Sequence, residues 1–137
     1  MRLIDFQVVR LHIPIFDIAY FFYCNASKMD LDMHGYYLKL YFNTVSETIK
    51  NLGSDPKKVY PYKIFKEQFK EYSVIGLSFA LSLIKVFTRK SNPVNVIESV
   101  KDGKSIGEAF RTDDPMSDDY KKRMKDLVLH FVENKYI

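Results

Sequence analysis

The stretch that decides the fold is RLIDFQVVRLHIPIFDIAYFFYCNAS, residues 2–27. Residues 2–10 are rich in Ile, Leu, Phe and Val and are bounded by charge, which predicts a short strand. Pro14 suits the first turn of a helix, and the helix after it is apolar nearly all round, which predicts deep burial. A single carboxylate interrupts each element, Asp5 in the strand and Asp17 in the helix.

Downstream of this stretch the sequence predicts further helices. A cap at Ser27 or Asp30 and a stop at Gly53 bound a long helix. Its apolar stripe is Tyr37, Leu40, Tyr41, Thr44, Val45, Thr48 and Leu52. Residues 60–72 form an amphipathic helix that continues, with a bend at Gly76, into a buried core helix. The inner face of the amphipathic helix is Tyr62, Phe65, Phe69 and Tyr72.

The C-terminal part predicts a loop over 89–116, with one short helix near 105–110, and then a last helix. Ser117 caps that helix. Its buried stripe is Tyr120, Met124, Leu127, Val128 and Phe131. One short N-terminal strand and about five helices together predict a mainly-α fold.

A lone strand leaves backbone groups unpaired, and buried backbone groups must be paired. Either residues 2–10 are not a strand, or the partner strand lies on sequence outside these 137 residues. The second alternative favours a C-terminal piece of a larger fold, because Met1 abuts the strand with no lead-in.

Composition narrows the functional classes. The net charge of +4, with both signs interleaved, is too mild to indicate nucleic-acid binding. The longest apolar run, 74–86, falls short of the roughly 20 residues that a membrane-spanning helix needs. One cysteine, Cys24, fits a reducing compartment, and we expect a cytoplasmic protein.

Asp5 and Asp17 are the candidate functional residues, and each has two interpretations. Asp5 is either a strand residue that points to solvent or a carboxylate aimed at Mg²⁺, which is often held by one or two carboxylates plus phosphate oxygens. Asp17, expected to be buried, must find hydrogen-bond donors. These are either the amides of its own first helical turn or the amides of another loop that it holds in shape.

The remaining candidates carry less weight. His12, His34 and His130 have no metal-ligand spacing, so all three are interpreted as incidental. Cys24 is expected to be a small core residue. The sequence GKSIG, 103–107, lacks the full phosphate-loop pattern. The lysines at 57, 58, 63, 66 and 70 predict a solvated helix face.

The segment LIDFQVVRLHIPIFDIAYFFYCNAS resembles the region after the catalytic loop in the ecdysteroid kinase-like proteins, also called CHK kinase-like proteins. This family is abundant in insects and is similar to choline kinases and aminoglycoside phosphotransferases. Residues 60–81 and 120–137 resemble its later helices more loosely. The resemblance implies that residues 1–137 are a partial domain, the helical C-terminal lobe of a protein-kinase-like α+β fold.

The resemblance also implies an activity. It is phosphorylation of a hydroxyl on a small molecule, with ecdysteroids as the named substrate class and ATP and Mg²⁺ as cofactors. Asp5 matches the metal-binding acid of the family's Asp-Phe-Gln, and Gln7 stands where protein kinases have Gly. Asp17 matches the acid of Asp-(Leu/Ile)-Ala-Tyr, which supports the catalytic loop. The expected partner is thus a small molecule, with no nucleic acid and no membrane.

The departures from the family pattern set the expected activity. The His-Gly-Asp catalytic loop with its downstream Asn is missing, as are the nucleotide-binding lobe and its Lys. The resemblance places that loop just upstream of Met1, so no catalytic residue is expected in this chain. Phosphoryl transfer needs these parts together, and the chain alone is expected to be an inactive fragment. The alternatives are a stand-alone helical binding module derived from a kinase lobe, and an unrelated helical protein in which Asp5 is an ordinary surface residue.

Overall fold

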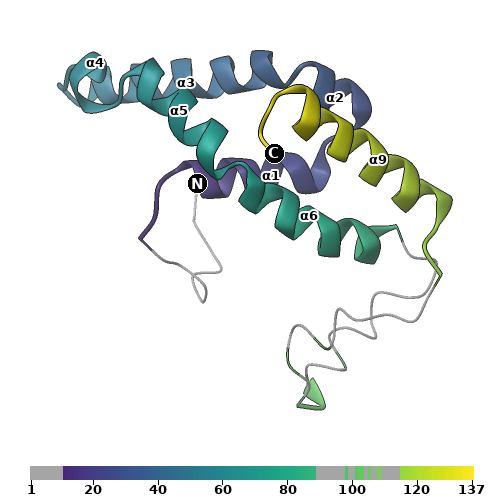
Figure 1. Cartoon of the computed structure of the whole chain (residues 1–137). Coiled ribbons are helices and arrows are strands. Elements are labelled where there is room, and N and C mark those ends of the chain that lie inside the picture. The colour runs from purple at the N-terminus through teal and green to yellow at the C-terminus, as the bar shows by residue number, and fades with distance from the viewer. Residues whose placement is uncertain (1–10, 89–97, 99–100, 104, 106–107, 109–114) are drawn as a thin grey trace.

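The computed structural model describes residues 11–88, 98, 101–103, 105, 108 and 115–137. Within these ranges the regular elements are all helical (Figure 1), which confirms the mainly-α fold class. The predicted strand 2–10 and most of the predicted loop 89–116 lie outside the described residues. The helices are α1 (Ile15–Asn25), α2 (Lys28–Asp32), α3 (His34–Asn51), α4 (Pro56–Val59), α5 (Tyr62–Tyr72), α6 (Val74–Phe87) and α9 (Asp118–Glu133).

Helix α1 forms the centre of the fold and packs mainly against α6 and α5. Ile15, Ala19 and Tyr23 are completely buried on its inner side. Tyr20 and Phe21, in contrast, are exposed. The expectation of burial on every side was therefore wrong, because an apolar composition does not specify which faces the neighbouring helices cover.

The contact between α1 and α6 depends on small residues. A Cβ atom added at Gly76 would lie 2.6 Å from Cδ2 of Tyr23 and closer still to the carbonyl oxygen of Ala19. Both positions are far inside van der Waals contact, so only glycine allows the two helices to approach this closely. Ala80, one turn further along α6, is also completely buried.

The predicted long second helix is divided in two. Ser27 caps α2 in a capping box with Asp30, which confirms the predicted start, and the chain then turns at Met33 into α3. The inner side of α3 differs from the predicted stripe, because Leu38 packs against the core instead of Leu40. The exposed members of that stripe are Leu40, Thr44, Thr48 and Leu52.

Gly53 ends α3, as predicted. Its positive φ of 82° is the left-handed conformation that glycine adopts without strain. Its amide donates to the carbonyl of Lys50 at 2.9 Å, and the Ser54 amide donates to that of Ile49 at 3.1 Å. These two bonds form a Schellman motif, which satisfies carbonyls at the end of the helix.

Helices α5 and α6 meet at the buried Ser73. The bend was predicted at Gly76, which instead lies inside α6. The amphipathic pattern of α5 is confirmed, with Phe65 and Phe69 buried. Helix α6 is only half-buried, because Phe79 and several of its neighbours are exposed. The predicted burial of α6 was wrong for the same reason as that of α1.

Helix α9 closes the core by packing against α2 and α6 (Figure 1). The Ser117 hydroxyl accepts a hydrogen bond from the Tyr120 amide at 3.1 Å, so the predicted cap is confirmed. Val128, predicted to be buried, is 41% exposed, and His130 is buried on this helix instead. The other buried residues of α9 are Met124, Leu127 and Phe131, as predicted.

Candidate functional site

Of the two predicted functional acids, the structure describes only one. Asp5 lies outside the described residues, as does Gln7. Asp17 lies in the first turn of α1 and is exposed, so its predicted burial was wrong. The reason is its helical phase, since Asp17 falls on the opposite side of α1 from the buried Ile15 and Ala19.

The catalytic loop that the resemblance placed upstream of Met1 is not tested by the structure. Met1 itself, like the rest of residues 1–10, lies outside the described residues. The expectation that this chain carries no catalytic residue of its own therefore stays a prediction.

The interpretation that Asp17 caps its own helix fails. The N-cap of α1 is Pro14, and no side chain accepts a hydrogen bond at this cap. The Asp17 carboxylate instead acts on Tyr41 of α3. Burial raises the pKa of the Tyr41 hydroxyl, and the negative charge of Asp17 raises it further. Asp17 is therefore within electrostatic reach of Tyr41.

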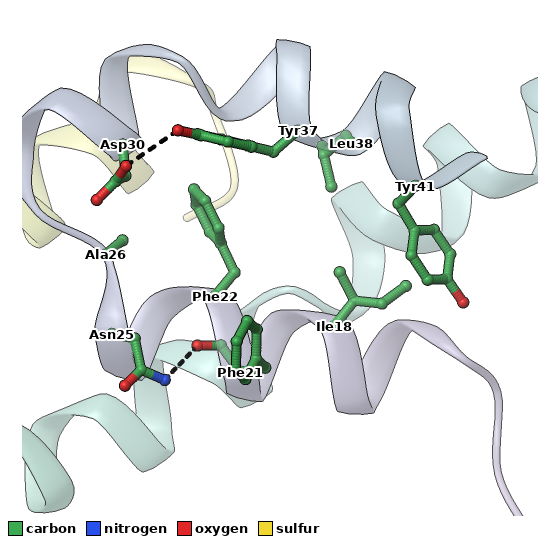
Figure 2. Close-up of a pocket in the computed structure, with 9 residues that line it drawn as sticks. All are labelled: Ile18, Phe21, Phe22, Asn25, Ala26, Asp30, Tyr37, Leu38 and Tyr41. Atoms are coloured by element: carbon green, nitrogen blue, oxygen red, sulfur yellow. Dashed lines mark hydrogen bonds between the residues drawn. The ribbon is translucent and has the colours of Figure 1, made fainter. Parts of the chain in front are cut away.

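A groove lies beside Tyr41, between α1 on one side and α2 and α3 on the other. Its volume is about 360 Å³. Figure 2 shows the side chains that line it, with the aromatic ring of Phe22 standing between the two walls. The lining residues are Ile18, Phe21, Phe22, Asn25, Ala26, Asp30, Tyr37, Leu38 and Tyr41.

One end of the groove is polar (Figure 2). There the Tyr37 hydroxyl donates to Asp30 at 3.2 Å. Hydrogen bonds from the Ser27 hydroxyl, and then from its amide, hold the pKa of the Asp30 carboxyl below its usual range. At the same end the side-chain amide of Asn25 donates to the Phe21 carbonyl at 2.7 Å. The Asp30 carboxylate thus already accepts hydrogen bonds from Ser27 and Tyr37.

This arrangement suits a small molecule with an apolar body and polar groups at its ends. Most of the lining is aliphatic or aromatic, and binding sites of this kind use a few polar groups to orient the ligand. The Tyr41 hydroxyl marks the end of the groove opposite Asn25 (Figure 2). Within the described part of the chain, neither the Asn25 side-chain oxygen nor the Tyr41 hydroxyl accepts a hydrogen bond, so these groups are open to a ligand hydroxyl.

Sequence reasoning missed one cluster, which joins α1, α3, α9 and the C-terminal residues. The rings of His34 and His130 meet edge to face, with centroids 4.6 Å apart. Nε2 of His130 lies 3.4 Å from the Tyr23 hydroxyl, and Nε2 of His34 lies 3.4 Å from the Tyr136 hydroxyl. Burial is the main cause that lowers the pKa of both imidazoles. No local signal could have revealed a pair so far apart in sequence.

The predicted cysteine and lysines behave as expected. Cys24 is buried in the core, and burial raises the pKa of its thiol. The lysines at 57, 58, 63, 66 and 70 are exposed.

Neither a metal cluster nor a membrane span is found among the described residues. They include no group of three or more His, Cys, Asp or Glu side chains that could hold a metal ion. Within the same ranges, no helix has the length and apolarity needed to cross a membrane.

Comparison with known proteins identifies one similarity. The model of the ecdysteroid kinase-like family matches residues 1–54. This confirms the predicted resemblance for the segment that runs through α3, and the looser resemblance of the later helices stays a prediction. No curated protein and no solved structure matches the chain. The matched segment contains Asp5, Asp17 and every residue that lines the groove.

Proposed function

We propose that this chain supplies part of a phosphotransferase that uses ATP and Mg²⁺ to phosphorylate a hydroxyl of a small molecule. The observation that carries the proposal is the family match over 1–54, because that segment holds both candidate acids and the whole groove. The later helices support this segment by covering the inner face of α1.

The two acids have different proposed roles. Asp5 contributes one carboxylate to the metal site, and the remaining ligands come from other parts of the enzyme. Asp17 holds the catalytic loop by accepting hydrogen bonds from its backbone amides. Its exposure, and the absence of a hydrogen-bond partner among the described residues, support this role, since the carboxylate is open to donors from elsewhere.

The groove is the proposed site of the acceptor molecule. Asp17 is next in sequence to Ile18, which lines the groove, and its charge acts on Tyr41, so a loop held by Asp17 would border the groove. The reacting hydroxyl of the acceptor would then lie beside Tyr41. The apolar middle would bury the body of the molecule. An ecdysteroid, the substrate class that gives the family its name, has an apolar ring system and several hydroxyls.

A titration tests the acceptor site directly. Ile18→Phe adds volume inside the groove, whereas Leu40→Phe adds volume at an exposed position outside it. We expect saturable binding of an ecdysteroid in calorimetry by the original chain and by Leu40→Phe, and at least about tenfold weaker binding by Ile18→Phe, because the larger ring displaces part of the ligand body. Equal binding by both variants, or no saturable binding by the original chain, would refute the groove as the acceptor site.

A second experiment tests the chemistry. The sequence contains no His-Gly-Asp motif, and phosphoryl transfer depends on positioning and charge neutralisation by several parts acting together. We expect no ATP turnover by this chain and no difference between it and Asp5→Asn. In a chain that also carries a catalytic loop and a nucleotide-binding lobe, Asp5→Asn should abolish transfer. Turnover by these residues alone would contradict the proposed dependence on those parts.

The alternative is a helical binding module without enzymatic activity. The observation that favours it is that side chains of α1, α2 and α3 already line a groove suited to a small molecule. This alternative predicts ligand binding that is unchanged by Asp5→Asn in every context, and no phosphorylated product in a longer chain. For either function we propose a cytoplasmic location, on the basis of the single, buried and unpaired cysteine.

A further inference from the structure

A second cleft lies on another side of α3, between α3, α5 and Tyr136. Its volume is about 290 Å³. It shares only Leu38 with the groove proposed for the acceptor, and most of its lining lies on α5, which follows the segment matched by the family model. The cleft is therefore a separate site. The lining residues are His34, Gly35, Leu38, Tyr62, Phe65, Lys66, Phe69, Lys70 and Tyr136.

The floor of this cleft is aromatic. Phe65 and Phe69 are 0% and 2% exposed, so they support the floor from beneath. The half-buried rings of Tyr62 and Tyr136 form its accessible surface. The rings of Tyr62 and Phe65 are nearly parallel, with 20° between their planes and 6.1 Å between their centroids. Rigid aromatic walls of this kind favour a flat apolar ligand, because such a ligand loses little conformational freedom on binding.

The rim of the cleft is positively charged. Lys66 and Lys70 lie one turn apart on α5, and both line the opening. The ammonium groups of Lys39 and Lys66 lie 4.2 Å and 5.1 Å from the centroid of the Tyr62 ring. None of these three lysines forms an ion pair with an acidic residue in the described ranges.

Among the described residues, no acidic side chain lines the rim. The lining residues that the structure describes include no Asp or Glu. The nearby Glu67 pairs instead with Lys63, at 3.9 Å, on the outer side of α5. The opening therefore presents two ammonium groups above an aromatic floor, with no Asp or Glu among its described lining residues.

We propose that this cleft binds a free aromatic carboxylate, whose ring lies against Tyr62 and Tyr136 and whose acid group lies between Lys66 and Lys70. The floor accounts for the apolar body, and the two lysines account for the negative charge. Neither feature alone defines the ligand, because the acceptor groove is also apolar and other lysines are also exposed. Of the two cavities described, only this one combines both features.

The test compares 2-naphthoate with 2-naphthamide, which has nearly the same shape and no charge. Because the chain contains no Trp, naphthalene fluorescence can be excited without interference from indole, and its anisotropy reports binding. An exposed lysine–carboxylate pair changes affinity by a factor of about 1.5 to 5. We therefore expect naphthoate to bind roughly fivefold more tightly than naphthamide, with a preference that falls as salt is added.

Two double variants with the same change of charge locate the site. Lys66→Gln with Lys70→Gln should remove the preference for naphthoate, and Lys57→Gln with Lys58→Gln on α4 should preserve it. The groove-filling variant Ile18→Phe should bind naphthoate normally, so failure of the acceptor site would leave this result unchanged. Equal binding of the two ligands by the original chain, or equal effects of the two double variants, would overturn the proposal.

Discussion

The buried imidazole of His130 makes the stability of this fold depend on pH. The residue is 6% exposed, and its Nε2 lies near the Tyr23 hydroxyl. Desolvation is the main cause that lowers the pKa of His130 from 6.5 to about 4, and the positive charges of His34 and Lys28 lower it further. The negative charge of Asp32 raises this pKa and offsets part of the shift. The perturbation that isolates this effect is His130→Gln, which keeps a polar side chain and removes the titrating group.

The sign and size of the effect follow from proton linkage. Between pH 6.5 and about 4 the unfolded chain binds the proton and the folded chain does not. The contribution of His130 to the free energy of unfolding is therefore highest above pH 6.5 and falls as the pH is lowered toward 4. At about 1.4 kcal/mol for each tenfold change in proton affinity, protonation of His130 can lower the free energy of unfolding by at most about 3 kcal/mol. We expect about 2 kcal/mol, because the charged side chain can move toward solvent.

Urea unfolding followed by far-UV circular dichroism, at a series of pH values from about 7.5 to about 4.5, measures this quantity. His130→Gln should be less stable than the original chain near neutral pH, through lost packing, and the gap should narrow by about 2 kcal/mol as the pH falls. His12→Gln is the control, since His12 is exposed and stacks on Phe16, away from the cluster. A constant gap across the whole range would refute the role of His130.

Three further predictions concern packing, capping and solubility. Gly76→Ala should destabilise the fold by about 1–3 kcal/mol in a thermal melt, because the added methyl group meets the Ala19 backbone. The control is Gly35→Ala, which should be neutral or stabilising because no atom lies within 4 Å of the added Cβ. Ser117→Ala should cost about 1 kcal/mol in the same melt through loss of the α9 cap, and an unchanged melting temperature would exclude the cap as a contributor. The isolated chain should self-associate in sedimentation, and Phe21→Gln should reduce this because that ring is 70% exposed; equal association by both chains would exclude Phe21 as the cause.

The elements that the sequence predicted well are the ones set by local chemistry. The Ser117 cap, the Gly53 stop and the alternation of aromatic and charged residues in α5 each depend on residues within a few turns of one another. Their physical causes, a side-chain acceptor for free amides, a left-handed conformation and an amphipathic period, act at that range.

The features that the sequence did not predict depend on distant parts of the chain. The contact of His34 with His130 joins α3 to α9, and the exposed side of α1 depends on where α5 and α6 pack. Gly76 was interpreted as a local bend, and its actual role is an approach to α1. For the candidate site, the sequence singled out Asp17 but not the groove beside it, since the two walls of the groove meet only in the folded chain.

The central position of α1 has a consequence for biosynthesis. Helix α1 precedes in the chain both of its main packing partners, because α5 and α6 follow only after α2–α4. During translation, at roughly 5–20 residues per second, its aromatic residues leave the ribosome seconds before α6 can cover any of them. Until then Tyr23, which is completely buried in the finished fold, is as accessible as Phe21. Because Phe131 of α9 also packs on Tyr23, the nascent chain depends on protection from aggregation until α9 has been made.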